Sequence, residues 1–242
     1  MTPGVKGIII ACVIIFLAQS VLPGATYDPV RPGELGNSFE ELFGLSSQGF
    51  IGKLRLWQPV TYLFLHSTQG LFHLLFNMLM VWMFGCELER RWGTQAFLQF
   101  YLFCGVGAGL LSVGADVLFA AFGSGPWLSP VVTIGASGAV YGLLAAQGIL
   151  FPNRVILLFL FFPMRMRMAV LFMAGIAFWV AFTSSGSAVN HIAHLGGMAF
   201  GWIYLKRAWN LRRIWHEWRW KMRRRKYKVV SDIQDDDHHR FH

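Results

Sequence analysis

Apolar residues occur in long uninterrupted runs along this chain, and polar residues gather between the runs. Windows without Asp, Glu, Lys or Arg cover residues 7–24, 59–86, 95–115, 117–153 and 168–205, and a polar segment divides the last window. About 20 apolar residues cross a bilayer as a helix. The pattern therefore predicts an all-α polytopic membrane protein with six transmembrane helices, at residues 7–23, 69–85, 95–114, 134–151, 168–183 and 190–205.

Composition supports a membrane protein. Hydrophobic residues make up 55% of the 242 residues and charged residues only 14%, and the mean hydropathy is +0.48. These values exclude an ordinary soluble domain. The first run also resembles a signal peptide, but its length and the loose cleavage site after it favour a retained span. In the fifth span, Pro163, Arg165 and Arg167 separate an apolar run at 155–162 from the main body.

Basic residues set the predicted orientation. Of the 21 Lys and Arg, all but Arg31, Lys53 and Arg55 fall in segments that are cytoplasmic if the N-terminus is inside. The positive-inside rule therefore predicts an N-in, C-in topology, and an even number of spans agrees with it. The net charge of +9 is explained by topology, so no nucleic-acid partner is inferred.

The chain divides into a predicted membrane domain at 1–205, with a long outer loop at 25–58, and a basic, Trp-rich cytoplasmic tail at 206–242. The outer loop is either a lateral wall of a site or a simple connection, and its apolar residues Phe39, Leu42, Phe43 and Leu45 suit a membrane-surface segment. The tail suits a helix on an anionic leaflet, but a plain positive-inside anchor has the same composition, and we favour the anchor. Three scattered cysteines and a flexible acidic and His-rich end give no metal site, and no cofactor is expected.

Polar groups inside the predicted spans are few, and each needs a partner or a task. His73 and Asn77 share a face of the second span, and Ser137 and Tyr141 share a face of the fourth, because residues four apart lie on one side of a helix. Asn190, His191 and His194 begin the sixth. All three spans run from outside to inside, and at about 1.5 Å rise per residue these groups lie roughly 5–12 Å below the outer ends.

Small residues at four-residue spacing allow the fourth and sixth spans to approach closely. They are Gly138 and Gly142 on one span and Ala193, Gly197 and Gly201 on the other. The approach brings Ser137, beside Gly138, near His194, beside Ala193. A Ser hydroxyl becomes a nucleophile when a base such as His accepts its proton.

The spans contain no Asp or Glu, so we expect a Ser–His dyad whose imidazole is oriented by another group, with Asn190 and His191 left open as helpers. Acyl transfer also needs donors for the developing oxyanion. The Ser137 backbone N–H, near a helix N-terminus, and the side chains of His73 and Asn77 are the candidates.

These motifs resemble those of the rhomboid family of intramembrane serine proteases. The similarity covers about residues 59–205 and consists of "GASG" at 135–138 with Tyr141, "AHLGGMAFG" at 193–201, "HLLFN" at 73–77 and "ELERRWG" at 87–93. Four motifs in family order are a specific signal. One departure is that Gln58 and Pro59 stand where the family often has an aromatic–arginine pair.

The resemblance implies Ser137 as the nucleophile, His194 as the general base, and His73 with Asn77 as oxyanion donors. It also implies that Tyr141 packs on the His194 ring, that Gly135, Gly138, Gly197 and Gly201 support the site, and that Glu89 stabilises the inner loop. In the family the first outer loop is a membrane-embedded wall, the fifth span gates substrate entry, and the substrates are membrane proteins cut near the outer end of a transmembrane helix. His66 is interpreted as structural.

The favoured function is thus an intramembrane serine endopeptidase acting through an acyl-enzyme. The alternative is a catalytically silent rhomboid-like protein that binds membrane clients; this reading predicts loss of Ser or His, and the chain has both. A transporter needs polar groups along a whole path through the bilayer, whereas these stop in the outer third. An α/β-hydrolase elbow needs glycine at Ala139. Compactness and topology suit a bacterial inner membrane.

Overall fold

The computed structural model describes residues 1–22, 39–123, 126–158, 161–183 and 191–206, and these are mostly helical. The helices are α1 (Pro3–Val21), α2 (Phe39–Phe43), α3 (Gln58–Thr61), α4 (Leu71–Met80), α5 (Cys86–Trp92), α6 (Thr94–Ala121), α7 (Ser137–Leu150) and α8 (Met166–Thr183), followed by a last helix at 191–206. Shorter turns of other helix types lie at Gln48–Gly52, Tyr62–Phe64 and Val81–Gly85. Two strands, β1 (Val155–Leu158) and β2 (Phe162–Arg165), complete the described elements.

Helix is present at each of the six ranges predicted as spans. Three helices are long and apolar enough to cross a membrane: Pro3–Val21, Leu71–Trp92, in which the π-helical turn joins α4 to α5, and Thr94–Ala121. The apolar helices α7 and α8 are shorter. Residues 1–202 form one compact unit, and of the second unit the structure describes only 203–206. Asn190 and residues 207–242 of the predicted tail lie outside the described residues.

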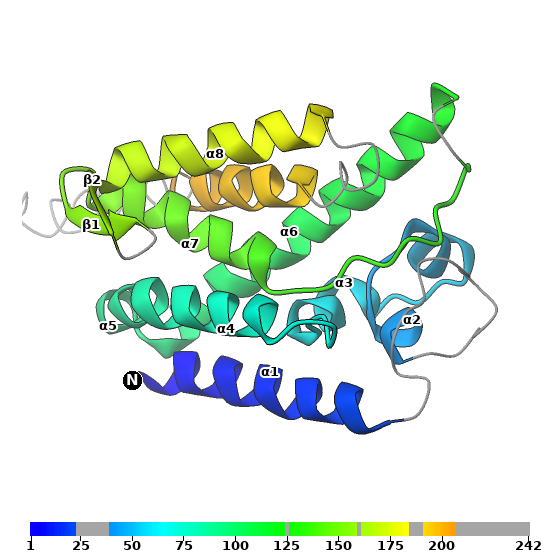
Figure 1. Cartoon of the computed structure of the whole chain (residues 1–242), viewed down its shortest axis with the longest axis horizontal. Helices are drawn as coiled ribbons and strands as arrows, with labels where there is room; N and C mark the ends of the chain where they lie inside the picture. The colour runs from blue at the N-terminus through cyan, green and yellow to red at the C-terminus, as the bar shows by residue number, and fades with distance from the viewer. Residues whose placement is uncertain (23–38, 124–125, 159–160, 184–190, 207–242) are drawn as a thin grey trace, which may run out of the picture. The chain divides into compact units, whose positions relative to one another are not determined.

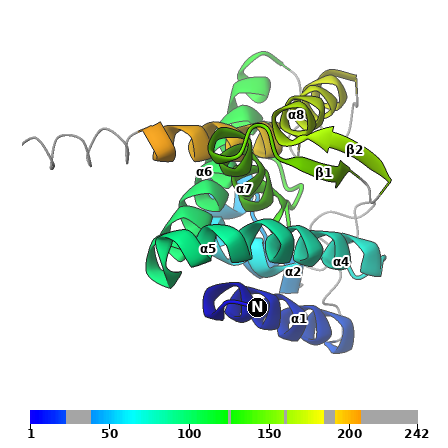
Figure 2. The same ribbon diagram turned by 90° about the vertical axis from the view of Figure 1, so that its left-hand side faces the viewer.

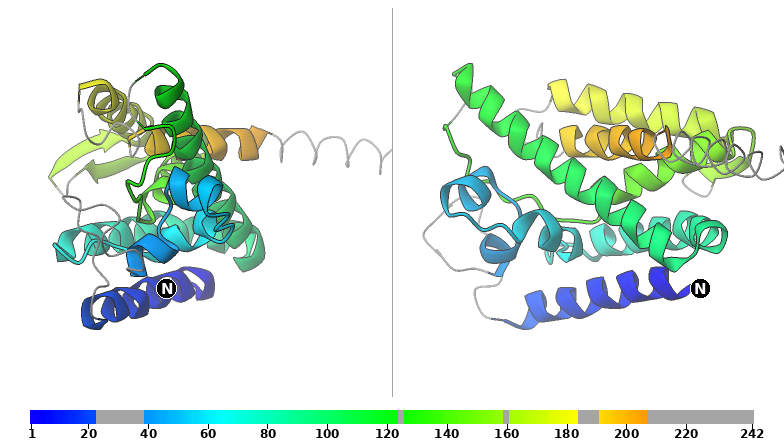
Figure 3. Two further views of the ribbon diagram at one scale, coloured as in Figure 1. Left: turned by 90° about the vertical axis from the view of Figure 1, so that its right-hand side faces the viewer. Right: turned by 180° about the vertical axis from the view of Figure 1, so that it is seen from behind.

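Within residues 1–202 the helices lie largely alongside one another (Figure 1). Helix α1 lies along α4 and α5 (Figure 2), and a Cβ added at Gly85 would meet the Val5 side chain at 2.9 Å. The last helix crosses α6 (Figure 3), where Gly107 lies directly against the Phe200 ring. Large side chains with no more than 1% exposure, including Tyr62, Phe97, Phe100, Tyr101 and Leu143, form the core between these helices.

Helix α6 is longer than predicted, because it continues past residue 114 and through Asp116 to Ala121. One acidic residue does not end a helix, since it removes no backbone hydrogen bond. The helix is terminated by Gly123, which has a positive φ of 77° just beyond the C-cap residue Phe122. Glycine adopts this left-handed conformation without a Cβ penalty.

The outer loop is held by side chains that the sequence did not mark as anchors. The buried amide of Gln58 donates to the carbonyl of Glu41 at 2.9 Å, and Arg55 donates to the same carbonyl at 2.7 Å. The prediction that Leu45 lies on the membrane surface is wrong. Leu45 is 1% exposed and exchanges two backbone hydrogen bonds with Thr133, because the loop folds inward against the segment before α7.

The segment after α7 forms an unpredicted antiparallel hairpin, in which Val155 pairs with Arg165 and Ile156 with Met164. β-Branched residues favour the pleated conformation, and Pro163 is tolerated because a two-stranded ribbon leaves edges free. Two backbone bonds fix the hairpin base, from Met166 N to the Arg154 carbonyl at 2.7 Å and from Arg167 N to the Pro152 carbonyl at 3.2 Å.

The carboxylate of Glu89 caps the start of α1. It accepts from the backbone N–H groups of Gly4 and Val5 at 2.7 and 2.9 Å, and from the hydroxyls of Thr94 and Thr2. The first N–H groups of a helix lack partners within the helix and carry partial positive charge, so a carboxylate satisfies them well. Glu89 thus joins α5 and the start of α6 to the beginning of the chain.

Candidate functional site

The polar residues singled out in three helices all lie near helix starts. His73 and Asn77 lie in the first two turns of α4, Ser137 is the first residue of α7, and His194 lies one turn into the last helix. The three helices begin toward the same end of the unit (Figure 1). The fold therefore brings these side chains to a similar depth.

Glycines decide how closely α7 and the last helix approach. A Cβ added at Gly197 would lie against the Gly138 carbonyl oxygen, and one added at Gly201 would lie 2.9 Å from the Gly142 oxygen. The two backbones are thus in contact without intervening side chains, as the small-residue spacing predicted. This approach brings the start of α7 against the first turn of the last helix.

Ser137 and His194 are in hydrogen-bond contact, with 2.8 Å between Oγ of Ser137 and Nε2 of His194. When Nε2 accepts the serine proton in this bond, the neutral imidazole carries its own proton on Nδ1. The Nδ1 atom is buried and has no hydrogen-bond partner among the described residues. No carboxylate completes a triad in that part of the chain.

Two aromatic rings contact the His194 imidazole and restrict its orientation. The Tyr141 ring stacks on the His194 ring, with 4.4 Å between centroids and an interplanar angle of 7°. The His191 ring meets His194 nearly perpendicularly, at 5.5 Å and 81°. Tyr141 is one turn after Ser137, so a single helix supplies both the hydroxyl and the flat surface that fixes the imidazole plane.

The turn before Ser137 runs against His73. Gly135 has a φ of 121°, which disfavours any residue with a side chain, and a Cβ there would lie 3.0 Å from both Cε1 and Nε2 of His73. Nδ1 of His73 accepts the Ser67 backbone N–H at 3.3 Å. The proton of a neutral His73 therefore lies on Nε2, the nitrogen beside Gly135.

Asn77 is buried, and its amide nitrogen donates to the His73 carbonyl of its own helix at 2.8 Å. An amide NH₂ has two hydrogens, so one donor is left over. His66 is fully buried, and its backbone N–H and carbonyl both bond to the Gln19 side chain, at 3.1 and 3.2 Å. These bonds involve only the backbone of His66, so the structural interpretation of its side chain stays a prediction.

Tyr62 is a scaffold residue that the sequence reasoning missed. Its hydroxyl donates to the Gly105 carbonyl at 2.6 Å, and its own carbonyl accepts from Gly135 N at 2.9 Å. It thereby ties α6 to the turn that carries Ser137. A tyrosine within the apolar window at 59–86 was the only signal, because a buried hydroxyl needs a partner.

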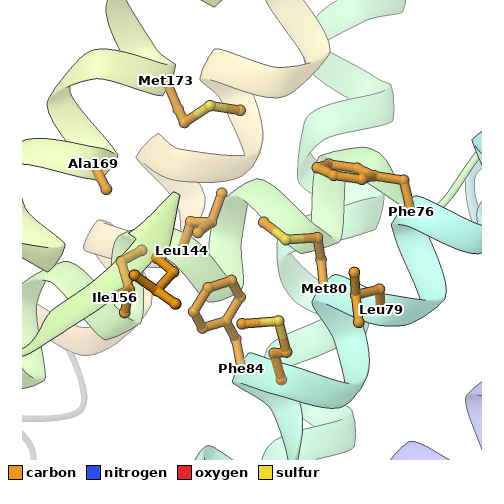
Figure 4. A pocket seen from close by; sticks show the side chains of 10 residues that line it. Phe76, Leu79, Met80, Phe84, Leu144, Ile156, Ala169 and Met173 are labelled. Carbon is orange, nitrogen blue, oxygen red and sulfur yellow. The ribbon is translucent and has the colours of Figure 1, made fainter. Parts of the chain in front are cut away.

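An apolar pocket opens between α4, the π-helical turn, α7, the hairpin and α8. Side chains from these elements converge on it (Figure 4). The lining residues are Phe76, Leu79, Met80, Met83, Phe84, Leu144, Ile156, Leu157, Ala169 and Met173. Across the described residues, no group of three His, Cys, Asp or Glu side chains is arranged to hold a metal ion.

Comparison with known proteins gives consistent matches. The chain is 34% identical over 143 residues to Rhomboid protein 1, mitochondrial, of Saccharomyces cerevisiae, covering 57% of this chain and 38% of that protein. It is 31% identical over 178 residues to Rhomboid-like protein 11, chloroplastic, of Arabidopsis thaliana, covering 69% and 58%. It is 34% identical over 104 residues to Rhomboid protease GluP of Bacillus subtilis, covering 43% and 18%.

The chain thus spans less than two thirds of each of these relatives. Their names and organisms point to mitochondria and chloroplasts as well as a bacterium, so they do not support the predicted bacterial inner membrane in particular. Apolar helices and family together identify an integral membrane protein. The sequence profile of the Rhomboid domain matches residues 53–210, well over half of the chain, and this protein therefore belongs to the rhomboid family.

Proposed function

We propose that this protein is an intramembrane serine endopeptidase that cuts transmembrane segments of membrane proteins near the outer face of the bilayer. The observation that carries the proposal is the 2.8 Å contact between Ser137 Oγ and His194 Nε2. A half-buried hydroxyl in hydrogen-bond contact with an imidazole nitrogen has the geometry of an activated nucleophile when that nitrogen accepts the bond. The Bacillus subtilis relative is named a rhomboid protease, which agrees with the proposal.

In the proposed reaction, Ser137 Oγ attacks the scissile carbonyl carbon while its proton passes to His194 Nε2. The tetrahedral intermediate collapses, the C–N bond breaks, and His194 returns the proton to the leaving amine. Water then repeats the sequence on the acyl-enzyme and frees Ser137. The stacked Tyr141 ring holds the imidazole in one plane throughout, which replaces orientation by a carboxylate.

Three donors are proposed for the oxyanion. The Ser137 backbone N–H lies at the first position of α7, where no intrahelical carbonyl is available. Nε2 of His73 carries a proton beside Gly135, and Asn77 has a spare amide hydrogen. Donors fixed in advance in a water-poor site stabilise developing charge most effectively.

A substrate helix is proposed to approach through the apolar pocket between α4 and α8 (Figure 4). Its apolar lining suits a transmembrane segment, and a helix must unwind locally before its carbonyl is accessible to Ser137. We further propose six spans with both termini inside, a catalytic unit within residues 1–205, and a tail at 206–242 that anchors the last span. No cofactor is needed for this chemistry.

The test is labelling of the detergent-solubilised protein by a fluorophosphonate probe, which reacts with activated serines. Wild type is expected to label, and Ser137→Ala and His194→Ala are expected not to. Ser20→Ala is the matched control, because its exposed hydroxyl lies outside the candidate site and donates to the Phe16 carbonyl of its own helix, α1. Folding of each variant is checked by thermal unfolding. A folded wild type that stays unlabelled, while an active relative labels in the same detergent, would favour the silent client-binding alternative.

A further inference from the structure

The paired strands β1 and β2 carry no residue of the proposed dyad and none of the proposed oxyanion donors. The hairpin that they form projects from the end of the unit where α7 ends and α8 begins, and it lies between α4 and α8 (Figure 2). Ile156 and Leu157 reach the apolar pocket. The hairpin base is fixed by the backbone bonds of Met166 and Arg167, so the ribbon has a defined direction relative to α8.

Much of the hairpin surface is apolar and uncovered. Val155 and Leu157 are 62% and 55% exposed, and Phe161 and Phe162, next to the tip, are 79% and 63% exposed. Exposed aromatic side chains on a ribbon this small are unfavourable in water. Phe161 and Phe162 lie next to each other, away from the ribbon's base, which indicates a surface that is covered in the native setting.

Positive charge lies at the opposite end of the ribbon. Arg165 is paired in register with Val155 at the base, and Arg167 follows in the first turn of α8; both are exposed. Arg154, the third basic residue, already pairs with Glu87 and lies over the Phe151 ring. No ion pair holds Arg165 or Arg167 among the described residues, and the sequence contains no Asp or Glu between Asp116 and Glu217.

We infer that the β1–β2 hairpin is an interfacial element that binds anionic phospholipid at this end of the protein, with Phe161 and Phe162 among the acyl chains and Arg165 and Arg167 at the phosphates. Exposed aromatic side chains and exposed arginines on one short element match the two requirements of an interfacial segment, which are apolar contact with lipid and attraction to its headgroups. Arginine binds phosphate with several donors at once. Anionic lipid is chosen over neutral lipid because Arg165 and Arg167 make no ion pair among the described residues, whereas Glu87 is already paired with Arg154.

This inference needs only that the protein is embedded in a membrane and does not depend on catalysis. A second copy pairing with the free edge of β1 or β2 is the competing occupant. It would cover the apolar residues equally well, but it would give the arginines no partner. The two cases differ in their dependence on lipid charge and on copy number.

The experiment places an environment-sensitive fluorophore on Phe161→Cys in the full chain, reconstituted at one copy per nanodisc. The native cysteines Cys12, Cys86 and Cys104 are buried, and unmodified protein gives the background. In phosphatidylcholine containing phosphatidylglycerol, we expect blue-shifted emission, quenching by doxyl-labelled lipid and protection from iodide. In phosphatidylcholine alone, the shift is expected to be smaller.

Charge variants complete the test. Arg165→Gln is expected to remove about half of the phosphatidylglycerol-dependent shift, since two arginines share the contact. Arg90→Gln, which removes one exposed charge from α5, is the matched control and is expected to leave the shift unchanged. A probe exposed to iodide in both lipids overturns the inference. The inference is also overturned if protection of the probe from iodide is the same with and without phosphatidylglycerol and is unchanged by Arg165→Gln. Protection that is seen only with two copies per disc overturns it as well.

Discussion

The two sides of α7 are packed in opposite ways. Toward the last helix, glycines bring backbone against backbone, and a Cβ at Gly142 would lie 3.2 Å from the Gly197 carbonyl. Toward α4 and α8, long flexible side chains such as Met80, Met83 and Met173 border an open pocket. Close packing resists displacement, whereas methionine side chains change shape at little cost.

The difference separates two demands of the proposed reaction. Hydrogen-bond geometry between Ser137 and His194 tolerates little movement, so the contact lies where the backbones are locked together. A substrate helix can enter only if the side chains that line the pocket move aside. The pocket is therefore lined by flexible side chains such as Met80 and Met173. Four substitutions test whether the rigid contact and the adaptable pocket are separate in this way.

Asn77→Ala removes one proposed oxyanion donor on the pocket-facing helix α4. The rate constant for cleavage is expected to fall about 10- to 1000-fold, because the lost bond forms chiefly in the transition state. Steady-state kinetics with a transmembrane substrate in detergent give the measurement. An unchanged rate in a folded variant would make Asn77 a packing residue, consistent with its bond to the His73 carbonyl.

Gly197→Ala inserts a methyl group against the Gly138 carbonyl. The free energy of unfolding is expected to fall by about 1–3 kcal/mol, the scale of overpacking in a tight interior. Gly175→Ala is the control, because a Cβ added there on α8 meets nothing within 4 Å. The measurement is denaturant unfolding in detergent. Equal stability of the two variants would contradict the close approach of α7 and the last helix.

Tyr141→Ala removes the ring that stacks on His194. Loss of one aromatic contact, worth about 0.5–1.5 kcal/mol, is expected to slow cleavage about 2- to 10-fold. Tyr141→Phe keeps the ring and is expected to behave like wild type. The comparison uses fluorophosphonate labelling rates, which need no substrate helix. If Phe were as slow as Ala, the hydroxyl rather than the stacking would matter.

Met173→Trp fills the pocket from α8 while leaving the Ser137–His194 contact untouched. KM for a transmembrane substrate is expected to rise, and the labelling rate by a small fluorophosphonate is expected to stay constant. Leu171→Trp is the control, because Leu171 is 65% exposed and does not line the pocket. Equal KM values for the two variants would show that substrate does not use this pocket.

Much of the fold was predictable because bilayer-length apolar runs have few alternatives to helix. The starts of α1 and α8 were placed within a few residues, and the residues of the candidate site were named from polar groups inside the predicted spans and from the resemblance to the rhomboid family. The hairpin was missed because a short apolar run fits a strand or a helix equally well. The inward position of Leu45 was missed because its partner, Thr133, is distant in sequence.

By itself, the sequence determined the helical character of the chain and the set of polar residues, because spacing along a helix fixes which side chains share a face. Only the tertiary structure decided which atoms meet. The Ser137–His194 distance and the Tyr141 stacking both arise from contacts between helices far apart in the chain. Such contacts depend on how closely backbones approach, and glycine allows that approach without specifying the partner.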